Sequence, residues 1–572
     1  MAVIGIDLGT TNSAMAIYRN GRSEIVLNGS DQRTTPSVYQ LKPNGEEIIG
    51  SSAKKGALSL PRHTVMEVKR LMGKDEQITV GERKYRPEEI SSKILAYFKK
   101  SAEEKLREEV TEAVVTVPAY FSDAQRKATK IAGELAGLKV ERIINEPTAA
   151  ALAYCHEHMD KNQHVLVYDL GGGTFDVSIV ELFEGVVEVK ASAGDNFLGG
   201  TDFDEAIMNM IKADFTSEKG YAIDEVAFDS DMLYFMLKEA AENAKIDLST
   251  QLETEIMLPL IGMRDNVPVS HQMKVTRSRF EDVIRDQVNS TLDKINLALS
   301  DADLVAEDIS EILMVGGSTR IPLVRESMER EFKKTVRTDL NPDEVVAIGA
   351  AVQAAIKSGE IDSTTGLMAI DVCPYTLGTE VNLHVNGRMM DGFFDPIIHR
   401  NSTIPVSETK LYYTANDYQE VVDVSVYQGE GRFISETELV SDDLKLDGIP
   451  RDLAGRQSLE VTFNYDINGL IQVDAKILST GKKVTQVIQY QPGVMSDKEI
   501  DQSFARLENE RVDSELLASV HALTLQAKRK MEHNSPEKNE IIGGLLTALT
   551  HAIETGNIVL IKKLEQQLSS LL

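Results

Sequence analysis

The sequence contains two copies of one short pattern, and this duplication restricts the possible folds more than any other feature. Asp7-Leu-Gly-Thr-Thr-Asn-Ser13 and Asp169-Leu-Gly-Gly-Gly-Thr-Phe-Asp176 each follow an apolar segment that is typical of a buried strand. In each copy a carboxylate stands at the end of the strand, followed by a glycine turn and hydroxyl side chains. Either copy alone is most simply interpreted as a tight hairpin turn. Both together favour two turns that face each other and hold one ligand between them.

The composition of both turns suits a polyphosphate. Glycines allow backbone N–H groups to curl toward an anion without a clash of Cβ atoms, and hydroxyls add further donors. A carboxylate beside the phosphate can hold Mg²⁺, which keeps several waters and bridges to phosphate oxygens. The sequence has no GxxxxGK[ST] loop. A third glycine element, Val315-Gly-Gly-Ser-Thr-Arg320, is either a surface that packs against a nucleoside or a plain strand-to-helix turn.

The chain is too long for one hydrophobic core. It has 572 residues, whereas single cores stop growing at about 250–300 residues. Apolar strand patterns alternate with helical patterns up to residue 360, and this mixture predicts an α/β domain over residues 1–360. Ser122 or Asp123 is expected to cap one of its helices. The predicted helices cover residues 87–108, 124–136, 202–216, 232–247, 277–299, 320–332 and 343–358.

The character of the sequence changes after residue 360. Residues 361–371 begin with a polar, turn-prone stretch and are interpreted as a linker. Apolar and polar residues then alternate with period two, which predicts a β-sandwich of antiparallel strands over residues 372–494. Residues 495–572 return to a helical pattern, which Asn534-Ser-Pro536 interrupts. We therefore expect a multidomain chain of α/β plus β class with a helical C-terminal part.

Charge and composition exclude several functions. Lys and Arg number 61 and Asp and Glu 90, so the net charge of −29 argues against non-specific binding to nucleic acid or anionic membranes. No stretch approaches the roughly 18 apolar residues of a membrane span, and the start, MAVIGIDLGT, is not a signal peptide. The two cysteines, Cys155 and Cys373, are interpreted as packed thiols in a reducing compartment. These features predict a cytoplasmic protein that binds neither nucleic acid nor membrane.

Longer strings in the sequence resemble the 70-kDa heat-shock chaperones, the DnaK family. They occur in the family's order and spacing, and the similarity extends from residue 1 to about residue 490. The resemblance implies an actin-like (ribonuclease H-like) ATPase domain, a β-sandwich peptide-binding domain and a short C-terminal helical lid. The strings are Val117-Pro-Ala-Tyr-Phe-Ser-Asp-Ala-Gln-Arg126, Ile143-Ile-Asn-Glu-Pro-Thr-Ala-Ala150, Asn341-Pro-Asp-Glu344 and Asp447-Gly-Ile449.

The resemblance implies five catalytic residues. Lys69 matches the catalytic lysine, whose ammonium would orient the attacking water and offset charge on the γ-phosphoryl group. Asp7 and Asp169 match the pair that holds Mg²⁺, largely through water. Thr174 matches the hydroxyl next to the γ-phosphate, and Glu146 matches the acid near the metal and the nucleophile. Without the family, Lys69 would be a solvated charge and Glu146 a carboxylate at a helix start.

The resemblance also assigns the nucleotide contacts, with ATP or ADP and Mg²⁺ as cofactors. K⁺ accompanies Mg²⁺ in the family, although no motif here indicates it. The adenosine-contacting set on one helix has i, i+3, i+7 spacing, which places these residues on one face. The matching residues are Gly9, Thr10, Thr11 and Asn12; Gly171, Gly172, Gly173 and Thr174; Gly199 and Gly200; Glu242, Lys245 and Ser249; and Gly316, Gly317, Ser318, Arg320 and Asp343.

Further matches concern communication and clients. Pro118 and Arg126 match the switch that couples ATP to peptide, and Arg142 matches a docking position for J-domain cochaperones. The alternative interpretation gives these residues no functional role: Pro118 is then a proline at the end of a strand, and Arg126 and Arg142 are surface arginines. The β-domain is expected to bind extended apolar segments of unfolded polypeptides, although alternating apolar residues in a sandwich are mostly core. The matching positions are Thr379, Tyr412, Ala415, Val422, Val424 and Leu459.

The sequence departs from the family pattern in several places. The stretch between Lys69 and Glu146 is short for a bacterial member, which leaves docking of a nucleotide exchange factor open. The linker, Thr364-Thr-Gly-Leu-Met-Ala-Ile-Asp371, lacks the usual acid-flanked leucine run. In the β-domain, Thr379 and Asn382 stand at positions that are usually apolar.

The C-terminal part departs from the pattern as well. The helical tail of 495–572 is shorter than a full lid, and Ala454 stands where a latch arginine is usual. These features make the chain more similar to the specialised bacterial HscC-like branch than to the housekeeping proteins.

The sequence thus predicts an ATP-dependent molecular chaperone in which hydrolysis controls the binding and release of unfolded polypeptides. A J-domain cochaperone is the expected partner, and the oligomeric state is left open. A small-molecule kinase would not explain the β-domain and tail, and the high net charge opposes an actin-like filament. A nucleotide-dependent regulator of one dedicated partner protein is the remaining alternative.

Overall fold

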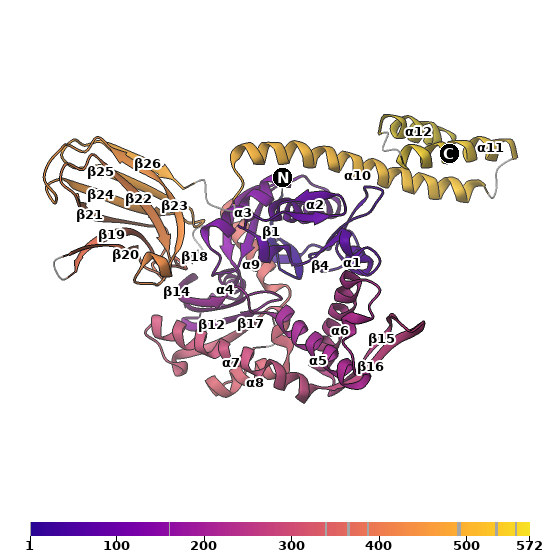
Figure 1. Ribbon diagram of the computed structural model, residues 1–572, viewed down its shortest axis with the longest axis horizontal. Coiled ribbons are helices and arrows are strands. Elements are labelled where there is room, and N and C mark those ends of the chain that lie inside the picture. Colours follow the sequence, from indigo (N-terminus) through magenta and orange to yellow (C-terminus); the bar gives the residue numbers. More distant parts are fainter. Residues whose placement is uncertain are drawn as a thin grey trace.

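The computed structural model describes residues 2–159, 161–337, 340–362, 366–385, 388–488, 494–531, 536–554 and 558–572. The chain forms a two-lobed α/β region, a β-sandwich beside it and a helical tail that runs along the first lobe (Figure 1). Residues 363–365 of the predicted linker lie outside the described residues. Within the described part of the chain, the helices are all too short or too polar to cross a membrane.

Two sheets with related topology carry the two Asp-Leu-Gly turns. In each sheet, the strand before the turn is antiparallel to the strand after it and parallel to a later strand on its other side. The duplication seen in the sequence is therefore a duplication of structure. The first sheet has the order β11-β10-β1-β2-β3, with β4 beside β2, and contains β1 (Ala2–Asp7), β2 (Asn12–Arg19), β3 (Arg22–Ile25), β4 (Thr34–Pro36), β10 (Val110–Val117) and β11 (Lys139–Asn145). The second has the order β17-β12-β13-β14-β18 and contains β12 (Gln163–Leu170), β13 (Phe175–Phe183), β14 (Val186–Asp195), β17 (Ile309–Val315) and β18 (Met368–Ile370).

Two helices, α4 (Glu146–Glu157) and α9 (Val345–Ser358), join the lobes. Small residues allow them to pack closely, since a Cβ on Gly349 would lie 1.7 Å from the carbonyl oxygen of Ala149. A Cβ on Gly5 of β1 would lie 2.2 Å from the backbone nitrogen of Ala351. These contacts fix the distance between the two sheets, and with it the distance between the two turns.

Each lobe is completed by outer elements. The helices predicted between residues 87 and 358 are all present, with small shifts at their ends, and Ser122 caps the helix that begins at Asp123, as expected. The long hairpin over residues 253–276 was not predicted. The first lobe adds β5 (Tyr39–Leu41), β6 (Glu47–Ile49), α1 (Ser51–Gly56), β7 (Thr64–Val65), β8 (Ile78–Val80), β9 (Arg83–Tyr85), α2 (Pro87–Leu106) and α3 (Asp123–Leu135). The second adds α5 (Gly200–Lys219), α6 (Ser230–Thr250), β15 (Glu253–Arg264), β16 (Val267–Thr276), α7 (Arg277–Asp301) and α8 (Pro322–Phe332).

The predicted β-sandwich is confirmed. Two four-stranded sheets, β20-β19-β22-β23 and β21-β24-β25-β26, pack face to face, and side chains along β24 and β25 alternate between buried and partly exposed. Its core includes Phe463, Ile398 and Leu446. The strands are β19 (Leu377–Val385), β20 (Arg388–Ile398), β21 (Val406–Tyr413), β22 (Val421–Gln428), β23 (Glu438–Asp447), β24 (Ser458–Tyr465), β25 (Ile471–Ile477) and β26 (Lys483–Val487).

The tail consists of α10 (Asp497–Met531), α11 (Pro536–Glu554) and α12 (Ile558–Leu571). The first part of α10 packs on the first lobe, where Met495 and Leu507 join the lobe's core. The far end of α10 packs with α11 and α12 in a separate cluster (Figure 1). The linker strand β18 is hydrogen-bonded to β14 of the second sheet. The sandwich contacts the α/β region as well, at Gly469 and Arg126, and so does the tail, at Leu507.

Candidate nucleotide site

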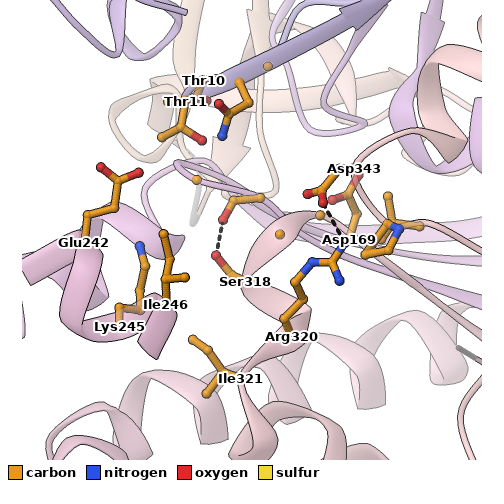
Figure 2. Close-up of a pocket in the computed structure, with 18 of the residues that line it drawn as sticks. Thr10, Thr11, Asp169, Glu242, Lys245, Ile246, Ser318, Arg320, Ile321 and Asp343 are labelled. Carbon is orange, nitrogen blue, oxygen red and sulfur yellow. Dashed lines mark hydrogen bonds and ion pairs between the residues drawn. The ribbon is translucent and has the colours of Figure 1, made fainter. Parts of the chain in front are cut away.

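A cleft of about 840 Å³ lies between the two lobes where the duplicated turns meet. One wall comes from the first turn and from α1, and the other from the second turn, α6 and the Gly316–Arg320 segment. In Figure 2, Thr10 and Thr11 lie on one side of the cleft, with Glu242, Lys245 and Ile246 on another and Arg320 and Asp343 on a third. The cleft is thus built from all but one of the segments that the sequence predicted for nucleotide contact, the exception being Gly199–Gly200.

The two turns touch each other because the second is made of glycines. A Cβ on Gly172 would lie 2.4 Å from the Cγ2 of Thr11, and a Cβ on Gly173 would lie 2.7 Å from the Cγ2 of Thr10. Gly199 packs on the same turn, since its Cβ would lie 2.6 Å from the nitrogen of Gly173. Any side chain at these positions would push the turns apart.

One end of the cleft is strongly acidic. Lys69 Nζ lies 2.5 Å from Glu146 Oε1, with both side chains buried. Asp169 is buried beside this pair, and Asp7 is partly buried there. Burial, with the negative charge of Glu146 second, raises the pKa of Asp7 to about 7 and raises the pKa of Asp169 well above its usual range. Burial likewise raises the pKa of Asp176 to about 7.

These carboxylates fit a bound cation. Four acids face one lysine, and Asp176 Oδ2 is buried without a hydrogen-bond partner. Thr116 donates a hydrogen bond of 3.0 Å to Asp7 Oδ1, which orients that carboxylate. Among the described residues, no three His, Cys, Asp or Glu side chains are grouped closely enough to form a direct metal site. This arrangement suits Mg²⁺, which retains most of its waters.

The other end of the cleft is held by hydrogen bonds between segments that are far apart in the chain. Lys245 donates a hydrogen bond of 2.8 Å to the carbonyl of Gly200. Ser318 Oγ donates a hydrogen bond of the same length to the carbonyl of Gly171 (Figure 2). Arg320 Nη2 lies 2.6 Å from Asp343 Oδ2, so its guanidinium is fixed at the edge of the cleft. A planar guanidinium held in this way can stack on a base.

Most of the predicted residues line the cleft, and a few lie directly behind it. Gly173, Gly199 and Gly200 are outside the lining set, although they support the turns that form it. The prediction missed residues that reach the cleft from neighbouring positions. Lys238 and Ile246 could have been found, because they lie four residues before and four residues after Glu242 on α6. The others, among them Lys54, Glu67, Arg325, Glu326 and Glu329, come from segments without a sequence signal for this chemistry.

Comparison with known proteins identifies the family. A family model described as Hsp70 protein matches residues 3–80 and 75–567. The chaperone protein DnaK of Thermosipho africanus (strain TCF52B) is 46% identical over 489 residues, which cover 85% of this chain and 79% of that protein. DnaK of Thermosipho melanesiensis is also 46% identical, over 85% of this chain and 80% of that protein. This chain belongs to the Hsp70 family.

Family membership settles the main activity. This Hsp70 is an ATP-dependent molecular chaperone and an ATPase, as the sequence predicted. Its family binds ATP or ADP, generally with Mg²⁺, and works on unfolded polypeptides with J-domain and nucleotide-exchange cochaperones. Neither comparison favours a regulator of one dedicated partner.

The residues predicted to couple the domains of this Hsp70 lie at the contact between lobe and sandwich. Arg126 is buried. Its Nη2 donates hydrogen bonds of 2.6 Å to Asn145 Oδ1 and of 3.0 Å to the carbonyl of Ala119. Gly469 of the sandwich sits on Arg126, since its Cβ would lie 2.9 Å from the arginine Cδ. Pro118 is buried just beyond β10, before Ala119.

Arg142, the position predicted for J-domain docking, faces the linker. Its Nη2 lies 3.5 Å from the carbonyl of Ala369 on β18. Burial lowers the pKa of its guanidinium, and Asp371 opposes this effect. Arg142 thus lies next to the linker at the point where β18 joins the second sheet.

The predicted peptide-binding residues lie on neighbouring strands of the sandwich. Val424 and Leu459 are only 4% and 2% exposed and belong to its core, with Val422 packed partly against it. The Thr379 hydroxyl donates 2.7 Å to the carbonyl of Ser425, and the Tyr412 hydroxyl donates 2.7 Å to Asp395. Their role in peptide binding remains a prediction.

The loops next to these strands carry exposed apolar groups that the sequence did not single out. Ala415 follows β21, in the loop that also holds Tyr418, which is 59% exposed. Tyr413 at the end of β21 and Leu453 in an adjacent loop are 56% and 51% exposed. Tyr418 N donates 2.7 Å to the carbonyl of Asp452, so the two loops lie side by side. They form one apolar edge at this end of the sandwich.

Proposed function

We propose that the cleft hydrolyses ATP with Lys69, Asp7, Asp169, Glu146 and Thr174 as its catalytic residues. The observation that carries this assignment is the buried Lys69–Glu146 pair, which lies between the two glycine turns at the acidic end of the cleft. The turns would donate backbone N–H groups to the phosphates, and Thr174 would donate its hydroxyl to the γ-phosphate. The adenosine would lie between the Glu242–Ser249 face of α6 and the Gly316–Arg320 segment.

The lysine and the acids have separate roles in this proposal. The Lys69 ammonium orients the attacking water and offsets charge that develops on the γ-phosphoryl group. Glu146 holds this ammonium in place, because the two groups are 2.5 Å apart in a buried site. Asp7 and Asp169 would hold Mg²⁺ through its waters, and the ion would supply charge neutralisation between the phosphates. The surplus of carboxylates over lysine also supports K⁺ as a second cation.

Two hydrogen-bonded routes connect this site to the peptide-binding sandwich. Asp176 Oδ1 accepts from the backbone of Tyr120 at 3.1 Å, and the Tyr120 carbonyl accepts from the hydroxyl of Tyr375 at 2.8 Å. On α4, Thr148 donates 2.9 Å to Asp371 of the linker. We propose that a change at the γ-phosphate moves these contacts and thereby shifts the sandwich between docked and released positions.

The finer assignments of partners follow from the same arrangement. Clients would bind along the apolar edge of the sandwich as extended segments, and the residues proposed for this binding remain Thr379, Tyr412, Ala415, Val422, Val424 and Leu459. Arg142 and the docked linker would form part of a J-domain docking surface. The need for a specific exchange factor, a cytoplasmic location and a specialised HscC-like role belong to the same proposal.

Steady-state ATP hydrolysis with and without a short extended apolar peptide tests the proposal, with Lys69→Ala as control for contaminating ATPases. We expect Lys69-dependent hydrolysis that rises when peptide is added. Hydrolysis that persists in Lys69→Ala and still rises when peptide is added, which a contaminating ATPase would not show, would overturn the role of Lys69. Lys69-dependent hydrolysis that ignores peptide would overturn the proposed coupling.

A further inference from the structure

Arg70 is the residue after the proposed catalytic lysine, and it spans the cleft at the phosphate end. It belongs to a short 3₁₀ helix, Val68–Leu71, whose Val68 is part of the first lobe's core. Its guanidinium crosses to Asp202 on α5 of the second lobe, with Nη2 to Oδ2 at 2.6 Å and Nη1 to Oδ1 at 3.4 Å. The contact is therefore a two-pronged ion pair between the lobes.

The same two side chains also hold both phosphate turns of the second lobe. Arg70 Nη2 donates 3.0 Å to the carbonyl of Gly173, and Asp202 Oδ2 accepts 2.7 Å from the backbone N–H of Gly199. Gly173 fits closely against the arginine, since a Cβ there would lie 2.8 Å from Arg70 Nε. The Arg70–Asp202 pair thus contacts the turn before Thr174 and the turn at the start of α5.

The site needs such a connection because its reacting groups belong to different lobes. Lys69 is paired with Glu146 of the first lobe, whereas Asp169 and Thr174 belong to the second. The distance between the ammonium and the γ-phosphate therefore depends on how the lobes are held together. Arg70 is bonded to Lys69 in the chain and to the phosphate turns through hydrogen bonds, so it sets this distance locally.

We propose that Arg70, through Asp202, is a positioning residue for ATP hydrolysis that fixes Lys69 relative to the Gly171–Thr174 turn. This inference rests on the proposed role of Lys69. Displacing a reacting group by about 1 Å can cost a factor of about 100 in rate even when binding is retained. The pair should therefore affect the hydrolysis step more than it affects ATP affinity.

Other ion pairs across the cleft lie farther from the phosphates and provide a contrast. Lys54 Nζ is 2.7 Å from Glu242 on α6, near the proposed adenosine wall. Arg62 reaches Asp229 at 3.0 Å and Asp231 at 2.9 Å, and its side chain is 70% exposed. Arg62 lines neither the turns nor the cleft, so Arg62→Ala removes a cross-cleft arginine without touching the proposed machinery.

The test is single-turnover hydrolysis of γ-labelled ATP at saturating enzyme, with ATP affinity measured separately in Arg70→Ala, Arg70→Lys, Asp202→Asn and the Arg70→Ala/Asp202→Asn pair. We expect the rate to fall about 10- to 100-fold in Arg70→Ala and in Asp202→Asn, with less than about a threefold change in ATP affinity. The double variant should be no slower than the slower single variant, because both remove one interaction. Arg62→Ala should hydrolyse ATP within about twofold of the parent rate.

Thermal melting of each variant separates positioning from misfolding. If Arg70→Ala melts at a lower temperature than the parent protein, the hydrolysis rate of Arg70→Lys decides the test. This variant keeps the positive charge but loses the two-pronged geometry. A rate within about threefold of the parent in both Arg70 variants, or rate losses that multiply in the double variant, would overturn the positioning role. Lys69→Ala tests the underlying assignment separately: full activity there would overturn the role of Lys69 itself.

Discussion

The ammonium of Lys69 lies 2.5 Å from the carboxylate of Glu146, and the two side chains are 5% and 10% exposed. Three further acids lie around this pair: burial, and after it the negative charge of Glu146, raises the pKa of Asp7, Asp169 and Asp176. Lys69 is the opposing charge at Asp7 and Asp169, where it lowers the pKa. The protein groups at this end of the cleft therefore carry more negative charge than positive charge.

The two partners of this pair should differ in their effect on stability. Lys69→Met leaves Glu146 buried beside three other acids, so we expect the free energy of unfolding of the nucleotide-free protein to fall by about 3–5 kcal/mol. Glu146→Gln removes one of the repelling acids and leaves Lys69 next to Asp7 and Asp169. The free energy of unfolding should therefore fall less in Glu146→Gln than in Lys69→Met, by about 2 kcal/mol or more. Urea unfolding in a chelating buffer measures both, and equal losses would contradict the charge imbalance.

Mg²⁺ and protons should compete at this acidic end. Because the pKa of Asp7 is raised from 3.8 to about 7, the folded protein holds a proton there below pH 7 that the unfolded chain releases near pH 4. The contribution of Asp7 to the free energy of unfolding of the metal-free protein is therefore fully present below pH 4. This contribution is lost as the pH rises from about 4 to about 7. Binding of Mg·ADP should release protons at pH 6 and almost none at pH 8.5.

Titration calorimetry in two buffers of different ionisation enthalpy measures this proton release directly. The affinity for Mg·ADP should rise with pH up to about 7 and then level off, in line with the pKa of Asp7. Asp7→Asn should reduce the number of protons released at pH 6. A proton count that is the same at both pH values would refute the linkage.

Local signals in the sequence predicted the elements of the fold well. The Asp7 and Asp169 patterns fall at equivalent turns of two related sheets, and Ser122 caps its helix as expected. The hairpin formed by Glu253–Arg264 and Val267–Thr276 escaped prediction although its second strand alternates regularly between buried and exposed residues. Its first strand carries apolar residues on both faces. Met257 and Leu260, for example, are exposed at its surface. Such a pattern lacks the clear period two of a half-buried strand.

Contacts between distant segments could not be predicted from the sequence. Arg70 and Asp202 are ordinary charged residues in the sequence, and only the closed cleft brings them together. Glu510 meets Lys93 in the same way, across more than 400 residues of chain. Periodicity describes which face of an element is buried, but it does not say which element covers that face.

Docking of the sandwich should depend on the absence of a side chain at Gly469. This turn residue has φ of +83°, and a Cβ would lie 2.9 Å from both Arg126 Cδ and the Tyr465 hydroxyl. In Gly469→Ala we expect the docked population in the presence of ATP to fall about tenfold or more, because Arg126 is fixed by its hydrogen bonds to Asn145 and Ala119. Hydrogen exchange of the β18 amides measures docking.

Gly481→Ala is the matched control for Gly469→Ala. Gly481 also lies in a turn of the sandwich and has φ of +72°, but a Cβ there would have no atom within 4 Å. Both variants carry the same backbone strain of about 1 kcal/mol, so they differ only in the contacts with Arg126 and with the Tyr465 hydroxyl. Equal protection of β18 in the two variants would contradict the role of these contacts.

The tail helix α10 should stay on the first lobe through the carboxylate of Glu510. Its Oε2 accepts 2.9 Å from Lys93 and 3.1 Å from the hydroxyl of Tyr85, and Arg83 lies 3.5 Å from Oε1. Only 12% of the Glu510 side chain is exposed, so these charge-assisted bonds are shielded from solvent. In Glu510→Gln we expect docking of α10 to weaken by about 2 kcal/mol, a factor of about 30. Lys93 keeps its second partner, Glu47, so the lobe itself should remain stable.

The distance between a label on α10 and one on the first lobe, measured by fluorescence transfer with ATP bound, reports this equilibrium. Asp501→Asn is the control, because it removes one carboxylate from an exposed position of the same helix and should leave the distance unchanged. Raising the salt concentration should have little effect on the parent protein, since buried pairs are screened far less than exposed ones. If Asp501→Asn and Glu510→Gln release the helix equally, general charge attraction rather than the Glu510 contacts holds α10 in place.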